Sequence, residues 1–364
     1  MKTVAFHTLG CKVNTYETEA MQQLMEAAGY RCVDFGEKAD VYIINTCSVT
    51  NIADRKSRQM LHRARKMNED AIVVAAGCYV ESAKEKIDED LSIDIIVGNN
   101  NKNEIVNIIN EYLQDKNENR FIIDINKNTE YEEFNISKIN DHTRAFIKVQ
   151  DGCNQFCSYC IIPFTRGRVR SRKMENIIEE VKKLASSGYK EVVLTGIHLS
   201  SYGVDFLDES YNKRMELLTQ TEESDEEFVT KNELLNLIEN ISKVDGIERI
   251  RIGSLEPRII KEGFIKRLSE INKFCPHFHL SLQSGCDKTL RSMNRKYTAS
   301  EFYEGVELIR KYFDSPAITT DIIVGFPGET KKDFEESRAF VEKVKFYETH
   351  IFPYSIREGT KAAN

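Results

Sequence analysis

Short apolar runs alternate with stretches of helical periodicity along most of the 364 residues. In the first hundred residues this pattern predicts strands at 4–9, 41–45, 71–76 and 93–97 and helices at 15–28, 52–67, 80–89 and 102–113. Strands and helices in strict alternation are typical of a doubly wound parallel α/β sheet. We therefore predict an N-terminal domain of this class over residues 1–113.

A second series of strands and helices follows a polar segment at 114–142, which we interpret as a linker with weak strand signals. Its expected strands are 145–149, 191–195, 248–252, 278–282, 318–324 and 346–352, and its expected helices are 174–187, 232–243, 258–270, 299–312 and 331–344. Six strands with intervening helices favour a partial (β/α)6 TIM-like barrel. We predict that it occupies residues 143–364.

Residues 203–230 interrupt the second series without any periodicity. They contain nine Asp or Glu residues against Lys213 and Arg214, so this segment alone accounts for the net charge of −7. We interpret it as a solvated acidic insertion. The total charge excludes a globally basic nucleic-acid binder, although local basic clusters remain.

No membrane-spanning or exported protein is expected. The chain has no run of 18 apolar residues, and its N-terminus is predicted to be a strand and not a signal peptide. Nine cysteines without an export signal favour a reducing compartment, and hence the cytoplasm, with metal-binding or catalytic roles for the thiols.

Three cysteines of the first domain directly follow predicted strands. They are Cys11, Cys47 and Cys78. Because the carboxyl ends of parallel strands share one edge of a sheet, these thiols are expected to converge. Three thiolates could bind an iron–sulfur cluster or a zinc ion there, and the alternative is three small buried apolar residues. Cys32 lies at the start of a strand, away from this edge, and fits a buried apolar role.

Cys153, Cys157 and Cys160 form a C-x3-C-x2-C loop directly after the first strand of the second series. Three thiolates cannot complete a four-cysteine site locally. A cubane cluster held by three cysteines leaves one iron open to a substrate. The alternatives are a zinc knuckle, or a ferredoxin-type site with Cys275 or Cys286 as a remote fourth ligand.

This cysteine loop, with an aromatic residue before its last cysteine, resembles that of radical S-adenosylmethionine (SAM) enzymes. The three earlier cysteines and the basic run at 166–172 (RGRVRSR) narrow the resemblance to the methylthiotransferases. Segments that resemble the branch acting on N6-threonylcarbamoyladenosine in tRNA are 8–14 (TLGCKVN), 45–50 (NTCSVT), 194–199 (LTGIHL), 282–285 (LQSG), 291–295 (RSMNR) and 321–329 (DIIVGFPGE).

The resemblance implies a transferase that adds a methylthio group to C2 of the adenine at position 37 of tRNA. It implies that Cys153, Cys157 and Cys160 hold a 4Fe–4S cluster that binds SAM. It further implies that Cys11, Cys47 and Cys78 hold an auxiliary 4Fe–4S cluster. The alternatives are a methylthiotransferase of N6-isopentenyladenosine in tRNA or of a ribosomal-protein aspartate, and a non-catalytic iron–sulfur or zinc module.

The resemblance also implies contacts to SAM, to tRNA and to an electron donor such as a flavodoxin or ferredoxin. Residues expected to contact SAM are Tyr159, Thr195, Gly196, Glu256, Gln283 and Gly325. Residues expected to contact RNA phosphates are Arg166, Arg168, Arg170 and Arg172. A second basic cluster, on the predicted helix 52–67, fits either phosphate contact or a solvated helix face. Members of the family usually carry a C-terminal TRAM domain, which we expect to be absent from residues 1–364.

Overall fold

A computed structural model describes residues 1–83, 87–115, 119–127, 130–134, 144–206 and 225–364. The chain packs into two compact units. The first consists of Met1–Asp141, Cys160–Arg168 and Arg357–Gly359. The second consists of His142–Tyr159, Val169–Ile356 and Thr360–Asn364. The described residues between 114 and 134 therefore belong to the first unit, and the predicted boundary at residue 113 stays a prediction.

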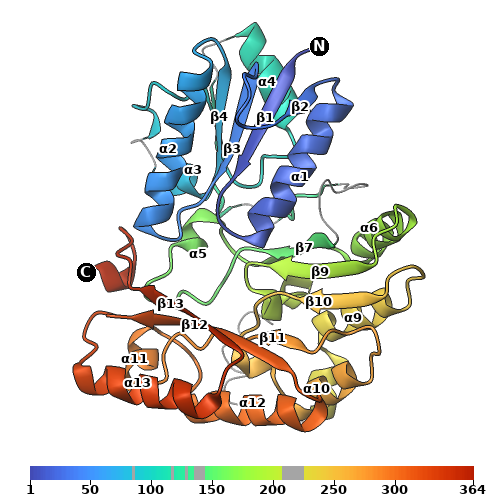
Figure 1. Cartoon of the computed structure of the whole chain (residues 1–364), viewed down its shortest axis with the longest axis vertical. Coiled ribbons are helices and arrows are strands. Elements are labelled where there is room, and N and C mark those ends of the chain that lie inside the picture. Colours follow the sequence, from blue (N-terminus) through green and yellow to red (C-terminus); the bar gives the residue numbers. More distant parts are fainter. Residues whose placement is uncertain (84–86, 116–118, 128–129, 135–143, 207–224) are drawn as a thin grey trace. The chain divides into compact units, whose positions relative to one another are not determined.

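The first unit contains a parallel six-stranded sheet of order β2-β1-β3-β4-β5-β6 (Figure 1). Its strands are β1 (Thr3–Thr8), β2 (Arg31–Val33), β3 (Val41–Thr46), β4 (Ile72–Gly77), β5 (Ile95–Val97) and β6 (Arg120–Phe121). All neighbouring strands pair in parallel. β6 arises from the weak strand signals of the 114–142 segment and extends the sheet at one edge.

Helices cover both faces of this sheet, which confirms the doubly wound class. They are α1 (Lys12–Ala27), α2 (Asn51–Met67), α3 (Cys78–Ala83) and α4 (Ile105–Gln114). On one face, Met21, Met25 and Ile108 from α1 and α4 pack on the strands. On the other face, Leu61 from α2 and Val80 from α3 pack on the strands. The predicted helix 80–89 is described only to Ala83, since residues 84–86 lie outside the described residues.

The second unit contains the six predicted parallel strands of a partial barrel. They are β7 (Ala145–Asp151), β9 (Glu191–Gly196), β10 (Arg249–Ile252), β11 (His277–His279), β12 (Ala317–Val324) and β13 (Glu348–Pro353). β7, β9 and β10 form one parallel set, and β11, β12 and β13 form another. Isolated parallel bridges, Ile250 to Phe274 and Leu255 to Leu280, connect the two sets. The spatial order therefore follows the chain order, as the (β/α)6 prediction requires.

Helices connect these strands. Five lie at the predicted places: α6 (Met174–Ser186), α9 (Glu233–Ser242), α10 (Glu262–Ser269), α12 (Ala299–Tyr312) and α13 (Lys331–Val344). Two were not predicted: α8 (Asp225–Thr230), which lies at the end of the segment interpreted as an insertion without periodicity, and α11 (Asp287–Ser292). Shorter elements are α5 (Ile162–Thr165), β8 (Arg170–Ser171) and the 3-10 turns Leu199–Ser201, Val204–Phe206, Pro257–Ile259 and Lys361–Ala363. Most of the acidic insertion, residues 207–224, lies outside the described residues.

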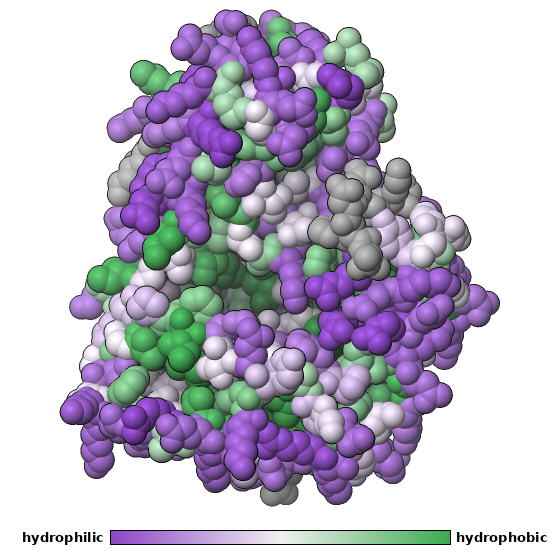
Figure 2. All heavy atoms as spheres, in the orientation of Figure 1, coloured by the Kyte–Doolittle hydropathy of each residue, from purple (hydrophilic) through white to green (hydrophobic). Residues whose placement is uncertain are grey.

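The outer helices of the barrel carry a polar surface. Atoms over α12 and α13 are mainly hydrophilic on the visible face (Figure 2). Both helices begin with a capping box, at Thr298 with Glu301 and at Thr330 with Asp333. Within the described residues, no helix is both long and apolar enough to cross a bilayer.

One buried carboxyl group of the first unit makes stability depend on pH. Burial raises the pKa of Glu19, on α1, to about 8. As pH rises above 4.5, the unfolded chain ionises this group first, so stability falls until about pH 8. We expect Glu19→Gln to stabilise the protein by roughly 1–3 kcal/mol at pH 8 and by much less at pH 5.5. Denaturant unfolding at both pH values measures this difference. Glu26→Gln, on the exposed side of α1, is the matched control, and an equal gain at both pH values would contradict the expectation.

Candidate functional site

The three cysteines of the first unit lie at one edge of its sheet. Cys11 precedes α1 as its N-cap, Cys47 directly follows β3, and Cys78 begins α3 directly after β4. Because β1, β3 and β4 are neighbours in the sheet, their carboxyl ends bring the three segments together. Cys47 and Cys78 are buried, and Cys11 is exposed. We call Cys11, Cys47 and Cys78 the rim cysteines.

Two glycines allow the backbone to approach the rim cysteines closely. Gly10 has a φ of +98°, and a Cβ there would lie 2.9 Å from Cys47 Sγ. Gly77 has a φ of +97°, and a Cβ there would lie 2.6 Å from Asn45 Oδ1. Each position therefore requires glycine both for its left-handed backbone and for the missing side chain. This explains physically why a glycine precedes Cys11 and another precedes Cys78.

Asn14 connects two of the cysteine-bearing loops. Its Nδ2 donates to the carbonyl of Leu9 at 2.7 Å and to that of Thr46 at 2.9 Å. The side chain of Asn45 in turn donates to the carbonyl of Asn14 at 3.0 Å. These bonds fix the backbone beside Cys11 and Cys47 before any ligand binds.

The thiols of the rim cysteines act on one another electrostatically. Burial is the main cause that raises the pKa of Cys47 to about 12, and charge on Cys78 and Cys11 contributes to this rise. Among the described residues, the three rim sulfurs do not all lie within 4.8 Å of one another.

Arg166 lies against this set and not on the surface. Its side chain is fully buried, and its Nε donates to Cys78 Sγ at 3.3 Å. Its Nη1 donates to Glu17 Oε1 at 2.9 Å, and its Nη2 donates to Asn14 Oδ1 at 2.6 Å. The prediction that Arg166 contacts RNA phosphates is therefore wrong, because the guanidinium is enclosed and paired inside the first unit.

The charge of Glu17 is shared with a second buried cation. Lys102 Nζ forms an ion pair with Glu17 Oε2 and donates to Asn99 Oδ1 at 2.8 Å. Asn99 Nδ2 donates to the carbonyl of Thr165 at 2.8 Å and lies 3.7 Å from Cys78 Sγ. Two cations therefore lie around one buried carboxylate, and one of them, Arg166, also donates to Cys78 Sγ. Glu17 and Lys102 are functional candidates that were not predicted, because no local sequence pattern shows that these two charged residues are buried as a pair.

A second buried arginine supports the Cys47 loop. Arg357 donates to Asp54 Oδ2 at 2.7 Å and to Ser48 Oγ at 2.8 Å. Ser48 in turn donates to Asp54 Oδ1 at 2.8 Å. Arg357 comes from the short C-terminal segment that packs with the first unit. It was also missed, because 303 residues separate it from Asp54.

In the second unit, the C-x3-C-x2-C loop starts directly after β7. Cys153 is buried and Cys157 is partly exposed, and Gly152 and Phe156 have φ values of +70° and +47°. Burial raises the pKa of Cys153 to about 12, and charge on Cys157 adds to this rise. Cys160 begins the Cys160–Arg168 segment, which packs with the first unit. The chain itself keeps the three cysteines within eight residues.

Hydrogen bonds with the last residue of α11 and with the residues after it hold this loop. Ser158 Oγ donates to the carbonyl of Ser292 at 2.8 Å, and Asn294 Nδ2 donates to that of Phe156 at 3.0 Å. Arg295 Nη1 donates to Cys157 Sγ at 3.2 Å. Each cysteine set thus has one guanidinium bonded to a sulfur, Arg166 at Cys78 and Arg295 at Cys157. Arg295 was part of a quoted motif, but the sequence analysis assigned it no role.

The structure separates Cys275 from the loop. Cys275 precedes β11, and its backbone N–H donates to Ile250 at the amino-terminal part of β10. The charges that act on its thiol include Arg249 and Glu191, at the starts of β10 and β9. The loop follows the opposite end of β7, so Cys275 is excluded as its fourth ligand. Cys286 is buried at the N-cap of α11 and stays an untested alternative.

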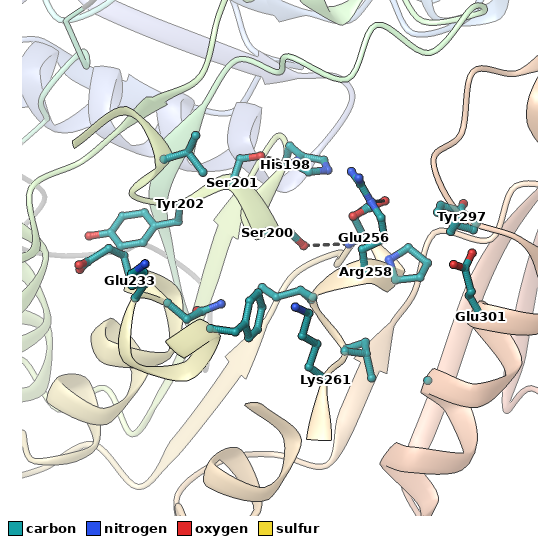
Figure 3. A pocket seen from close by; sticks show the side chains of 18 of the residues that line it. His198, Ser200, Ser201, Tyr202, Glu233, Glu256, Arg258, Lys261, Tyr297 and Glu301 are labelled. Carbon is teal, nitrogen blue, oxygen red and sulfur yellow. Dashed lines mark hydrogen bonds and ion pairs between the residues drawn. The ribbon is translucent and has the colours of Figure 1, made fainter. Parts of the chain in front are cut away.

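A cavity of about 610 Å³ opens in the second unit beside this loop. Gln155 of the loop lines it, as do residues that follow β9 and β10, among them Ser200, Glu256 and Arg258. Glu256, Arg258 and Tyr297 lie along one side of the cavity, and Lys261 lies below them (Figure 3). Arg258 Nε donates to Glu256 Oε1 at 2.8 Å, so the wall presents a paired positive and negative group.

His198 adds a neutral ring to the cavity. Burial lowers its pKa to about 4, so the ring is uncharged at neutral pH. Its Nδ1 lies 2.6 Å from Ser201 Oγ, and its Nε2 has no hydrogen-bond partner among the described residues. His198 lies within a quoted motif, but its role as a cavity residue was not predicted.

The residues predicted to contact SAM all lie near carboxyl ends of barrel strands. Thr195 and Gly196 end β9, Glu256 follows β10, Gln283 follows β11 and Gly325 follows β12. Tyr159 lies in the cysteine loop, with its ring 6.3 Å from that of Phe326. Of the six, the structure places Glu256 in the cavity lining. The other five stay predictions of SAM contact.

The predicted RNA-binding arginines divide into buried and exposed residues. Arg170 is 1% exposed and forms an ion pair with Asp151 at 3.9 Å. Arg172 is 1% exposed and pairs with Glu180 at 2.6 Å. As with Arg166, the predicted phosphate contact is wrong for both, because each charge is enclosed. Arg168 is exposed, and its contact with RNA stays a prediction.

The second basic cluster lies on α2. Its members are Arg55, Lys56, Arg58, Arg63, Arg65 and Lys66. All are exposed except Arg65, which is partly buried and paired with Asp94. A solvated face and a phosphate-binding face both remain compatible with this arrangement.

Two protein families match the chain. Residues 3–98 match the family described as "Uncharacterized protein family UPF0004", and residues 147–341 match the "Radical SAM superfamily". Among solved structures, the radical SAM methyltransferase TsrM from Kitasatospora setae, with cobalamin and a 4Fe–4S cluster bound, has a TM-score of 0.63 at 15% identity. That comparison covers 100% of this chain and 77% of TsrM, and it supports the fold.

Curated relatives match over the whole chain. "Threonylcarbamoyladenosine tRNA methylthiotransferase MtaB" of Bacillus subtilis is 42% identical, over 100% of this chain and 76% of that protein. The protein of the same name from Aquifex aeolicus is 40% identical, over 99% of this chain and 82% of that protein. The "tRNA-2-methylthio-N(6)-dimethylallyladenosine synthase" of a Thermoanaerobacter species is 37% identical, over 100% of this chain and 74% of that protein. With two families matched in the expected order and such relatives along its full length, the chain belongs to the radical SAM methylthiotransferase family, in the threonylcarbamoyladenosine branch that its motifs predict.

Proposed function

We propose that the chain transfers a methylthio group to C2 of N6-threonylcarbamoyladenosine at position 37 of tRNA. The observation that carries this proposal is the pair of three-cysteine sets, each at the carboxyl ends of parallel strands and each with an arginine donating to a sulfur. Two cysteine-held clusters match a reaction that both activates a carbon atom and supplies a sulfur.

We assign the loop cysteines Cys153, Cys157 and Cys160 to a SAM-binding 4Fe–4S cluster. We assign the rim cysteines to an auxiliary 4Fe–4S cluster. Bound at these residues, the clusters together with SAM supply the radical and the sulfur for the transfer. Three ligands per cluster leave one iron of each open, which is the property such chemistry requires.

The protein's own residues hold the ligand sulfurs and their loops. Arg166 and Arg295 each donate a hydrogen bond from the guanidinium to one ligand sulfur, which holds that sulfur in place. Asn14 and Asn294 fix the two loops through backbone carbonyls. Because these contacts exist within the fold, the ligand loops need little rearrangement when a cluster binds.

We further propose that the cavity beside the loop takes the amino-acid part of SAM. That group carries an ammonium and a carboxylate, and the cavity wall presents Glu256 beside Arg258. The unpartnered Nε2 of His198 offers one more polar contact at the same cavity. Thr195, Gly196, Gln283 and Gly325 would complete the contacts from neighbouring strand ends.

The tRNA surface in this proposal uses exposed basic residues only. They are Arg168 and the exposed members of the α2 cluster. The low-potential electron would come from a flavodoxin or ferredoxin, and the reaction is placed in the cytoplasm. Because phosphate contacts release counterions, we expect tRNA binding by these residues to weaken as salt is raised.

The test is an anaerobic reaction of the cluster-loaded protein with SAM, a reductant and tRNA. Nucleosides from digested tRNA are then identified by mass spectrometry. We expect a methylthiolated product with tRNA that carries N6-threonylcarbamoyladenosine. Product from N6-isopentenyladenosine tRNA alone, or from ribosomal protein alone, would overturn the assigned substrate.

Two matched cysteine variants test whether the rim cysteines are needed for the reaction. Cys47→Ala, at the rim, is expected to stop methylthiolation. Cys32→Ala lies in the same unit, outside the rim set, and is expected to leave turnover within about twofold. Equal loss in both variants would show that the first unit tolerates no cysteine change and would remove support for the rim assignment.

A further inference from the structure

A group of side chains that could ligate a metal lies in the barrel unit, and none of its members belongs to either cysteine set. It consists of His279 on β11, Asp321 on β12 and His350 on β13. One ligand atom from each lies within 4.8 Å of the other two, and no other group of three described His, Cys, Asp or Glu residues meets this spacing. We propose that these three residues bind a divalent first-row transition cation of the zinc type.

The sheet itself places the three side chains together. β12 pairs in parallel with β11 on one side and with β13 on the other. The register sets Asp321 opposite His350 and sets His279 opposite Thr319, two residues before Asp321. Because side chains alternate along a strand, Thr319 and Asp321 lie on the same face. The pairing of three neighbouring strands therefore brings the three ligand atoms together, and no loop has to rearrange.

The distances fit a metal site. His279 Nε2 lies 3.3 Å from Asp321 Oδ2. Zinc binds such atoms at about 2.0–2.2 Å, and two ligands at a tetrahedral angle are then about 3.3–3.6 Å apart. The His279 and His350 rings lie 6.1 Å apart between centroids and are inclined by 29°, so they flank the carboxylate with nearly parallel planes.

One ring already has the outer contact typical of a metal-bound histidine. His279 Nδ1 lies 2.9 Å from Thr319 Oγ1, which fixes the ring while Nε2 faces the carboxylate. Metal-ligating histidines usually hold their second ring nitrogen in such a hydrogen bond. A plain His–Asp ion pair would explain His279 and Asp321, but it gives no reason for the second imidazole.

The site is open enough to exchange an ion with solvent. The side chains of His279, Asp321 and His350 are 15%, 33% and 44% exposed. Glu348, two residues before His350 on β13, lies 3.9 Å from its Nδ1 and adds negative charge nearby. Two imidazoles and one carboxylate leave coordination positions for water or an oxygen ligand, a donor set that suits zinc or iron(II) and not magnesium or calcium. None of these residues belongs to a cysteine set, so the inference is independent of the proposed function.

The experiment uses the cluster-loaded protein, so that the six cysteines of the two sets are occupied by iron. After treatment with a mild chelator, the protein is titrated anaerobically with Zn²⁺ by calorimetry. Zinc and iron per chain are then measured after desalting. We expect one zinc per chain in addition to unchanged iron. His279→Gln and Asp321→Asn should each weaken zinc affinity by about 100-fold or more, since loss of an outer-shell partner alone costs about 10–100-fold.

Two further variants make the result decisive. His350→Gln changes a half-exposed residue and should leave the fold intact while removing the site, which iron content and circular dichroism verify. His62→Gln is the matched control, because His62 pairs with Asp90 at 3.0 Å but belongs to no group of three close donors among the described residues. Equal zinc binding by the wild type and His350→Gln, or a loss of zinc only when iron is also lost, would overturn the proposal.

Discussion

Replacing Cys153, Cys157 and Cys160 by alanine is expected to halve the iron content and abolish SAM cleavage. Two cubane clusters require about eight irons per chain, and the variant should keep about four at the rim cysteines. Without the loop thiolates, the variant lacks the cluster that we propose binds SAM. Iron and sulfide analysis, combined with detection of 5′-deoxyadenosine after reduction, measures both effects in one anaerobic preparation.

The reciprocal variant separates the two cysteine sets. Replacing Cys11, Cys47 and Cys78 should also leave about four irons, but SAM cleavage should persist while methylthiolation stops. Cys275→Ala is the control in the barrel unit, since that thiol lies near the amino-terminal ends of β9 and β10. A loop triple variant that retains all its iron would show that other residues ligate the first cluster.

The cysteine sets were predictable because their positions depend on local sequence and simple topology. A cysteine after an apolar run lies at the carboxyl edge of a parallel sheet whatever the rest of the chain does. Cys11, Cys47 and Cys78 follow β1, β3 and β4, which are neighbours in the sheet, as predicted. The loop cysteines are closer still in sequence, so their grouping needs no tertiary information.

The arginines of the 166–172 segment were not predictable in the same way. A basic run near a reactive centre resembles a phosphate-binding surface when only the sequence is visible. Its partners come from distant positions, Glu17 for Arg166 and Asp151 for Arg170. Burial of a charge is decided by whether such a partner exists, and neither hydrophobic periodicity nor spacing reveals the pairing.

The cation group on the barrel strands illustrates a related limit. His279, Asp321 and His350 are separated by 42 and 29 residues, and no short motif joins them. Their convergence depends on strand register, since a shift of one residue would move Asp321 to the other face. The positions of β11, β12 and β13 were predictable from the sequence, but the register in which these strands pair was not.

Arg166→Met is expected to destabilise the first unit by about 3–5 kcal/mol, the usual effect of removing one member of a buried ion pair. The substitution keeps a similar length and apolar stem. It leaves Glu17 buried and still paired with Lys102, and it removes the donor to Cys78 Sγ. We therefore expect a lower unfolding midpoint in denaturant and less iron retained at the rim cysteines, with loop-cluster iron and SAM cleavage preserved.

Arg168→Met is the matched control, because Arg168 lies two residues further along the same segment and is exposed. It should leave stability and iron nearly unchanged and should weaken only tRNA binding. Arg166→Lys tests the sulfur contact separately from the charge. Lysine keeps a cation near Glu17 but cannot reproduce the fork of donors to Glu17, Asn14 and Cys78. Compared with Arg166→Met, Arg166→Lys should restore much of the stability but little of the iron at the rim cysteines. The ion pair with Glu17 needs only a positive charge, whereas the contact with Cys78 Sγ needs the guanidinium Nε. If Arg166→Met keeps both its midpoint and its full iron content, the buried pair supports neither the fold nor the cluster, and the role argued for Arg166 at the rim cysteines fails.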